Sequence, residues 1–87
     1  METYNAKVLV RLKPVVLDPQ GKTVLSALKN LGFDEVRDAR VGKVIELEIE
    51  GGSEEAVRKQ IREMCSKLLA NPVIEDYEIE LNGERER

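Results

Sequence analysis

The chain has no histidine and no tryptophan, and its 87 residues include one cysteine, two tyrosines and one phenylalanine. Without histidine it lacks the commonest general base and metal ligand at neutral pH. A lone cysteine can form neither an internal disulfide nor a cysteine-rich metal site. The N-terminal stretch has no apolar signal core, and no apolar run approaches the roughly 18 residues of a membrane span. We therefore expect a cytoplasmic protein with no metal site and no membrane contact.

Positive charge is also in the minority. Lys and Arg total 14 against 17 Asp and Glu, a formal net charge of −3. Nucleic-acid-binding proteins need clustered positive charge to displace counterions, and usually aromatic rings for stacking. Because neither is present, nucleic acid is not expected as a partner. The length predicts a single domain with a thin core, over residues 1–81, followed by a solvated tail at 82–87.

Several segments alternate apolar and polar residues with the period of a β-strand. The clear ones are residues 6–13, 45–50 and 73–81. A weaker candidate, residues 35–41, has no purely apolar face and would be joined to 45–50 by a turn at 41–43. The apolar faces of the clear strands are Ala6, Val8, Val10 and Leu12; Ile45, Leu47 and Ile49; and Val73, Tyr77, Ile79 and Leu81.

A first helix is expected over residues 19–31. Asp18 followed by Pro19 is typical of a helix start, because the carboxylate can cap the helix and proline has its φ already set. Gly32 can take the left-handed conformation after the helix, with Phe33 folding back on Leu28 in a Schellman motif. The apolar stripe of this helix comprises Val24, Leu25, Leu28 and Leu31.

A second helix is expected to begin after Ser53 and to end at Asn71-Pro72. Its first turn carries Glu54 and Glu55, whose negative charge suits the positive end of the helix dipole. Its buried stripe is predicted to be Val57, Ile61, Met64, Cys65 and Leu68.

The element order β-α-β-β-α-β predicts an α+β fold, with a four-stranded antiparallel sheet and both helices on one face. Charge favours the ferredoxin-like strand order 4-1-3-2, which sets the basic first strand between two acidic ones. Opposite charges directly across a strand pair stabilise the sheet by about 0.2–1 kcal/mol. The outward residues concerned are Lys7, Arg11 and Lys13; Glu46, Glu48 and Glu50; and Asp76, Glu78 and Glu80.

Three possible chemical sites have simpler structural explanations. Gly21-Lys22-Thr23 ends like a phosphate-binding loop, but the position of its first glycine holds Val16 and Asp18 would place a carboxylate in the anion pocket. Cys65 lies on an apolar stripe without a histidine to activate it, so we expect a small buried side chain. The glutamates at 46–50 are about 7 Å apart along a strand, too far for a good cation site. We therefore expect no catalytic, cofactor-binding or metal-binding residue.

Two stretches, "VLDPQGKTVLSALKNLGFDEVRDARVGK" and "REMCSKLLANPVIEDYEIEL", resemble the PurS-type small subunit of phosphoribosylformylglycinamidine synthase. The likeness runs from Val8 to Leu81 without insertion or gap. Its most specific features are "LDPQG" after a strand ending in Leu-Lys, and "MC-x-KLLAN-x-VIEDY" near the C-terminus.

The resemblance implies a role in de novo purine synthesis, in the glutamine- and ATP-dependent conversion of formylglycinamide ribonucleotide (FGAR) to formylglycinamidine ribonucleotide (FGAM). A PurL-type synthetase subunit would use ATP and Mg²⁺, and a PurQ-type glutaminase would release ammonia. The small subunit would bridge the two for ammonia transfer, without catalytic residues or cofactors of its own, as a homodimer and possibly a tetramer. The expected contact residues lie in the loop before the first helix, in the hairpin turn and on the last strand: Asp18, Gln20 and Gly21; Arg40, Gly42 and Lys43; and Glu75, Asp76 and Tyr77.

Two alternatives share the expected element order. An amino-acid-sensing module of the ACT type binds its ligand at the loop before the first helix, and "LDPQGKTVLSAL" has a passing likeness to that site. A small ferredoxin-like phosphatase is less favoured, because the chain lacks an arginine in a phosphate-binding loop.

Overall fold

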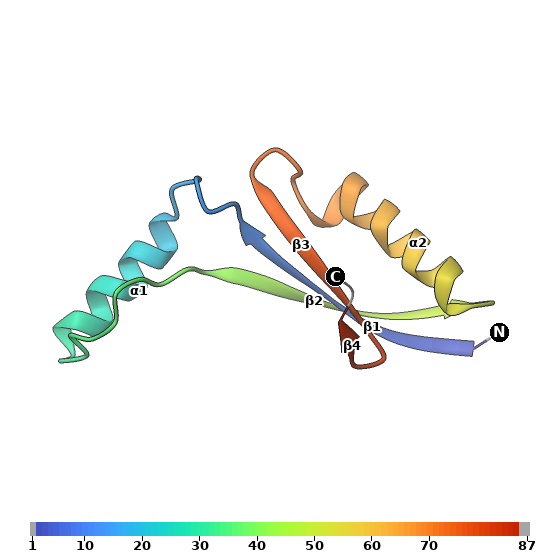
Figure 1. Ribbon diagram of the computed structural model, residues 1–87, viewed down its shortest axis with the longest axis horizontal. Coiled ribbons are helices and arrows are strands. Elements are labelled where there is room, and N and C mark those ends of the chain that lie inside the picture. The colour runs from blue at the N-terminus through green and yellow to red at the C-terminus, as the bar shows by residue number, and fades with distance from the viewer. Residues whose placement is uncertain (1, 86–87) are drawn as a thin grey trace.

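The computed structural model describes residues 2–85, which form one antiparallel sheet and two separate helices (Figure 1). Along the chain the elements are β1 (Glu2–Leu12), α1 (Pro19–Asn30), β2 (Gly42–Gly51), α2 (Glu54–Met64), a π-helical turn η1 (Cys65–Leu69), β3 (Glu75–Leu81) and β4 (Glu84–Arg85). The strand order is β2-β1-β3-β4. Within residues 2–85, no helix is both long and apolar enough to cross a membrane.

The expected ferredoxin-like fold, with four strands in the order 4-1-3-2 and both helices on one face, is wrong. Three long strands, β2-β1-β3, make the sheet, and the predicted strand at 35–41 is a loop. That loop has no apolar face that pairing could bury, and its own side chains engage the backbone: Asp38 accepts a hydrogen bond from the Ala39 N–H. The two-residue β4, which follows a turn at Asn82-Gly83, pairs with the end of β3. Residues 86 and 87 of the expected tail lie outside the described residues.

The central position of β1 agrees with the charge pattern. Lys7 lies in register between Glu46 of β2 and Glu80 of β3, so the basic strand separates the two acidic ones. Two ion pairs follow at the other end of the sheet: Arg11–Glu78 at 3.4 Å and Lys13–Asp76 at 3.3 Å. These side chains are partly exposed, and each pair contributes at most about 1 kcal/mol. They fix the register more than they add to stability.

The core lies between the other face of the sheet and α2. Ser53 caps α2 as expected, accepting a hydrogen bond from the Ala56 N–H. Gly51 is packed so closely against Val57 that a side chain there would collide with it, which brings α2 directly onto the end of β2. The buried residues of this core are Tyr4, Ala6, Val8, Val10, Val57, Ile61, Cys65, Ala70, Ile79 and Leu81.

The end of the second helical segment differs from the expected stripe. Val57, Ile61 and Cys65 are buried as predicted, but Leu68 is 83% exposed and Leu69 packs against the core instead. The cause is the π-helical turn, in which the Ala70 N–H donates to the Cys65 carbonyl. This wider turn adds a residue and moves the apolar face by one position.

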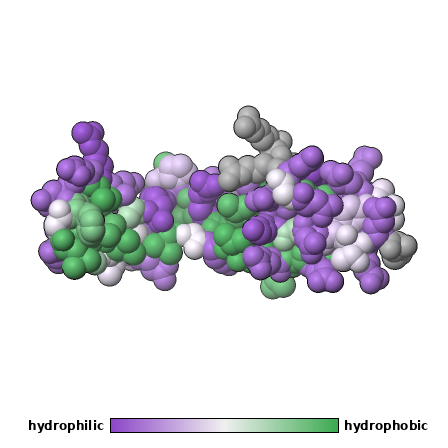
Figure 2. Space-filling model, turned by 90° about the horizontal axis from the view of Figure 1, so that it is seen from below, coloured by the Kyte–Doolittle hydropathy of each residue, from purple (hydrophilic) through white to green (hydrophobic). Residues whose placement is uncertain are grey.

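Helix α1 stands away from the sheet, at the opposite end of the molecule from α2 (Figure 1). Its ends are as predicted: Asp18 caps it, and Gly32 (φ +100°) with the Phe33 N–H donating to Leu28 forms the Schellman motif. Its expected burial is wrong, since Gly21 is its one buried residue and Leu31 is 74% exposed. Figure 2 shows apolar side chains gathered at this end of the molecule.

The separation of α1 makes the molecule elongated. The radius of gyration is 16.2 Å and the extents are 51 × 25 × 18 Å, whereas a compact chain of this length has a radius of gyration of about 12 Å. Of the two helices expected to cover the sheet, only α2 therefore contributes to the core of the described chain.

Candidate functional site

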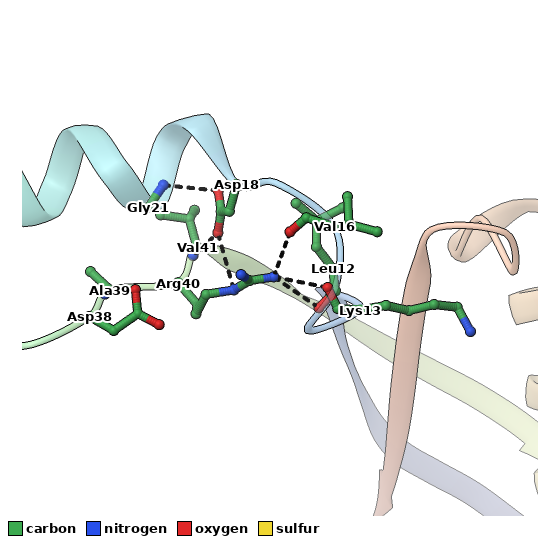
Figure 3. A network of polar contacts seen from close by, with 9 residues as sticks. All are labelled: Leu12, Lys13, Val16, Asp18, Gly21, Asp38, Ala39, Arg40 and Val41. Atoms are coloured by element: carbon green, nitrogen blue, oxygen red, sulfur yellow. Dashed lines mark hydrogen bonds and ion pairs between the residues drawn. The ribbon is translucent and has the colours of Figure 1, made fainter.

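The segments that join α1 to the sheet, residues 13–18 and 38–41, form a polar junction that we call the elbow (Figure 3). Asp18, 4% exposed, is the one buried charged residue identified in the described chain. One of its carboxylate oxygens, Oδ1, accepts a hydrogen bond from the Gly21 N–H, and the other, Oδ2, accepts one from the Val41 N–H, both at 2.9 Å. A single carboxylate thus caps α1 and holds the start of the returning strand.

Arg40 completes the elbow from the other side. Its Nη2 donates to the carbonyl oxygens of Lys13 at 3.0 Å and Val16 at 3.2 Å, with a longer contact of 3.5 Å to Leu12. Its Nε lies 3.8 Å from Oδ2 of Asp18. The guanidinium therefore satisfies carbonyl groups of a loop that has no strand partner, and it ties that loop to the cap of α1.

Gly21 is required at the elbow by close approach. A Cβ at this position would collide with the carbonyl oxygen of Ala39 and lie 2.8 Å from the Asp18 carboxylate. Gly42 is similarly confined, since its Cβ would lie 2.6 Å from the carbonyl oxygen of Val10. Gly21 lets the start of α1 pack directly against the backbone at Ala39, and Gly42 lets the start of β2 pack directly against β1.

The structure brings the nine predicted contact residues to one end of the sheet. Five of them, Asp18, Gln20, Gly42, Lys43 and Glu75, line an open cavity of about 410 Å³ beside the N-terminus of α1. Arg40, Asp76 and Tyr77 line a neighbouring cavity of about 550 Å³, and Arg11 and Leu12 border both. Gly21 lies beneath the surface, where its N–H binds Asp18.

Two apolar residues at the elbow were missed by the sequence analysis. Val15 is 92% exposed and Leu17 is 65% exposed, and both line a further cavity of about 300 Å³ together with Arg40. The signal was present in "KPVVLDP", where three apolar residues lie between two prolines and belong to neither a strand nor a helix. Exposed apolar side chains on a loop that is held rigidly are suited to contact another protein.

The chemistry available to this surface is binding. Among residues 2–85, no group of three or more carboxylate or thiol side chains is placed to hold a metal ion. Cys65, at the C-terminal end of α2, is fully buried in the core, and this burial raises the pKa of its thiol, so that the reactive thiolate is disfavoured. A cavity of about 710 Å³ on the charged face of the sheet is lined by Lys7, by its cross-strand charge partners Glu46 and Glu80, and by Glu48, which lies opposite Asn5.

Known proteins resemble this chain along almost its whole length. The family model PurS, described as phosphoribosylformylglycinamidine (FGAM) synthase, matches residues 5–83. The chain belongs to the PurS family.

Individual relatives match at close to full length. The chain is 49% identical over 78 residues to the FGAM synthase subunit PurS of Methanocaldococcus jannaschii, covering 90% of this chain and 94% of the relative. It is 51% identical over 78 residues to PurS of Bacillus subtilis, with 90% and 92% covered. Among solved structures, a chain of PurLQS from Thermotoga maritima superposes with a TM-score of 0.87 at 32% identity, covering 93% of this chain and 99% of that one.

Membership of the PurS family decides between the alternatives left open by the sequence. The ACT-type sensing module and the small phosphatase both depended on a ferredoxin-like sheet, which residues 2–85 do not form. The "LDPQG" segment forms the cap of α1 in the elbow, where the Asp18 carboxylate occupies the place that an anion would need.

We predict that Gly21→Ala destabilises the protein by about 1–3 kcal/mol, because the added methyl group must displace Ala39 or the Asp18 carboxylate. The sign of this change in the free energy of unfolding tests the close packing, because alanine in place of glycine inside a helix normally stabilises by about 1 kcal/mol. Gly52→Ala is the matched control: a Cβ there meets nothing within 4 Å, so its free energy of unfolding should change by less than about 0.5 kcal/mol. Urea unfolding at one fixed protein concentration measures both.

A second prediction concerns pH. The hydrogen bonds from Gly21 and Val41, with the charge of Arg40, hold the pKa of the Asp18 carboxyl below its ordinary value. A carboxyl whose pKa is lowered on folding stabilises the folded state above its unfolded pKa, and this stabilisation is lost as the pH falls through the folded pKa. Asp18→Asn should therefore be less stable than the wild type at pH 7, and the difference should shrink below about pH 4.

Asparagine is chosen because its oxygen can still cap the helix. Its amide also loses the acceptor for either the Gly21 or the Val41 N–H, and because that loss does not vary with pH, the pH dependence of the difference reports the charge. Asp34→Asn, in the exposed loop after α1, is the control for the loss of a carboxylate, and its free energy of unfolding at pH 7 should stay within about 0.5 kcal/mol of the wild type. A difference between Asp18→Asn and wild type that stayed constant from pH 7 to about pH 2 would contradict the role of the charge.

Proposed function

We propose that this chain is the small, non-catalytic subunit of an FGAM synthase, and that it holds a PurL-type synthetase and a PurQ-type glutaminase together. The main support is the near-complete match to a chain of PurLQS from Thermotoga maritima, which covers 99% of that chain. The relatives at 49% and 51% identity are also described as PurS subunits of FGAM synthase. The reaction is the glutamine- and ATP-dependent conversion of FGAR to FGAM in purine biosynthesis, in the cytoplasm.

In this role the chain holds the two enzymes in a fixed relative position. Ammonia released by the glutaminase must reach the activated substrate on the synthetase before it is lost to water. Holding the two enzymes in one complex turns this transfer into a local event with a high effective concentration. ATP and Mg²⁺ belong to the synthetase, and this chain binds no cofactor of its own.

The elbow, together with the two cavities beside it, is the surface that we assign to these contacts. It combines exposed apolar side chains, Val15 and Leu17, with charged and polar groups that line two adjacent cavities. Apolar side chains next to charged and polar groups are typical of protein interfaces. The elbow is also held by the Asp18–Arg40 network, so it does not have to be ordered on binding.

Self-association is the second part of the proposal. The exposed apolar side chains at the α1 end, Val24, Leu31 and Phe33, form a patch without a partner within the described chain. Burying one such side chain fully is worth about 1.5–3 kcal/mol. The core of a chain this small is thin, so a homodimer, or a tetramer built from it, would supply the missing burial.

Reconstitution tests the adaptor role. The purified chain, added to synthetase and glutaminase subunits, should raise glutamine-dependent FGAM formation at least several-fold. With an ammonium salt in place of glutamine the increase should be much smaller, because the nitrogen then comes from solution. An increase of equal size with both nitrogen sources would point to direct activation of the synthetase and would contradict ammonia transfer.

A charge-reversal pair tests the assigned surface in the same assay. Lys43→Glu changes a residue that lines the cavity beside the N-terminus of α1. Lys59→Glu makes the same change on the exposed side of α2. We expect Lys43→Glu to lower the glutamine-dependent rate, while Lys59→Glu leaves it close to wild type. Equal effects would remove the elbow as the contact surface.

The homodimer is tested by Leu31→Asp, which introduces a charge into the apolar patch at a position that is already 74% exposed. We expect the dimer dissociation constant to rise at least tenfold, measured by analytical ultracentrifugation. Ser26→Asp, on the polar side of α1, is the control and should leave it unchanged. Dimers of equal strength in both variants would show that α1 does not mediate association.

A further inference from the structure

We propose that Asn82 is a modification site, where the chain loses ammonia from a side-chain amide without any enzyme, and that the folded turn restrains this reaction. The turn Asn82-Gly83 joins β3 to the short β4, which folds back on the end of β3 (Figure 1). Neither the reaction nor its restraint depends on the partners proposed above for the chain.

The reaction is an attack by a backbone nitrogen on the side chain that precedes it. The Gly83 nitrogen bonds to Cγ of Asn82, and the bond from Cγ to the amide nitrogen breaks. The proton of the Gly83 N–H leaves with the amide group as ammonia, and the chain is left with a cyclic succinimide. Water, the only co-reactant, then opens the ring at either of its carbonyl carbons. The product is aspartate or isoaspartate at position 82.

Asn82 is the asparagine of this chain best suited to the reaction. The four asparagines are followed by Ala6, Leu31, Pro72 and Gly83. Proline has no N–H to lose, and the side chains of alanine and leucine crowd the attacking nitrogen, whereas glycine has no side chain. Asn82 and Gly83 are both exposed, and a Cβ built on Gly83 meets nothing within 4 Å. Water therefore reaches this turn freely.

The backbone of the turn opposes the attack. Asn82 has φ +48° and Gly83 has φ +88°, as in the tight two-residue turns that join antiparallel strands. Residues in the left-handed region have ψ of about +47°, which places the next backbone nitrogen on the opposite side of the chain from the side chain. The Gly83 nitrogen can approach Cγ of Asn82 only after the turn changes its conformation.

Two hydrogen bonds to β1 hold the turn in this conformation. The Asn82 N–H donates to the Asn5 carbonyl at 2.8 Å, and the Asn5 N–H donates to Oδ1 of Asn82 at 3.0 Å. Because Oδ1 is bonded to the carbon that must be attacked, the second hydrogen bond has to break before that carbon can reach the Gly83 nitrogen. The rate of deamidation therefore follows the population of the opened turn.

The modification would loosen the end of β3. Isoaspartate adds a carbon atom to the main chain, so that the turn can no longer align both hydrogen bonds with Asn5. Leu81, which is 1% exposed and lies opposite Ala6 of β1, directly precedes the turn. Either product also adds a negative charge beside the cavity of about 710 Å³, where like charges already repel. The charged residues lining that cavity are Lys7, Glu46, Glu48 and Glu80.

Mass spectrometry tests the site and its restraint. The full chain is kept at mildly alkaline pH in native buffer and in guanidinium chloride, and conversion is followed in the tryptic peptide 68–85. We expect Asn82 to convert about tenfold faster or more in the denaturant, because the turn and its hydrogen bonds are lost there. Asn71 lies in the same peptide before Pro72 and is the internal control, which should stay unchanged in both conditions.

Other results would overturn the proposal. Equal rates in the two conditions would show that the folded turn does not restrain Asn82, and a faster reaction in native buffer would show that the turn promotes it. An Asn82 that stays unconverted in the denaturant would remove the site. Gly83→Ala is also measured in the denaturant, where folding of the variant does not matter. Its conversion should be about tenfold slower or more, and an unchanged rate would exclude attack by the nitrogen of residue 83.

Hydrogen exchange tests the hydrogen bonds to β1 in the folded chain. The isoaspartate form, separated from the unmodified chain by chromatography, should exchange its Asn5 N–H about tenfold faster or more, because the acceptor is displaced. The Val8 N–H is the control, since Val8 lies between Ile45 and Ile79 in the middle of the sheet and should exchange at an unchanged rate. Equal exchange of Asn5 in both forms would overturn the loosening of β3.

Discussion

The shape of the molecule depends on the ion pair and hydrogen bonds between Asp18, Arg40 and the backbone of the elbow. The Asp18 carboxylate caps α1 and holds the Val41 N–H, while the guanidinium of Arg40 gathers carbonyl groups from the loop after β1. Buried polar groups of this kind are costly when unpaired, so the set is stable only when complete. These contacts hold α1 in its direction, because within residues 2–85 the apolar side chains of α1 are not buried against the sheet.

The Asp18–Arg40 contacts separate the chain into two regions with different roles. The sheet and α2 share a closed core, in which β1 is buried on one face and paired with opposite charges on the other. The α1 end has exposed apolar side chains and an ordered polar junction. A subunit of the PurS family without reacting groups can act only through its surface, and here the apolar surface and the rigid junction lie at the same end.

Local features were predictable from the sequence because they depend on neighbours along the chain. Asp18 and Ser53 cap the helices, Gly32 and Phe33 form the Schellman motif, and the basic β1 lies between two acidic strands. The nine contact residues were predicted from two loops, the last strand and a family resemblance, and the structure places them at one end of the sheet. Their role as contacts remains a prediction. Leu69 replaced Leu68 in the core because a π-helical turn changes the phase, which periodicity alone cannot reveal.

The sequence by itself determined where the helices begin, the membership of the PurS family, and the neighbours of β1. Each of these follows from side chains that act over a few residues or from a pattern of charge. Only the tertiary structure decided that residues 35–41 form no strand and that α1 leaves the sheet. The apolar stripe of α1 predicts burial against the sheet, and only the folded chain shows that the stripe is not buried there. The start of α1 is held by Asp18 and Arg40, which lie 22 positions apart and meet only when the chain has folded.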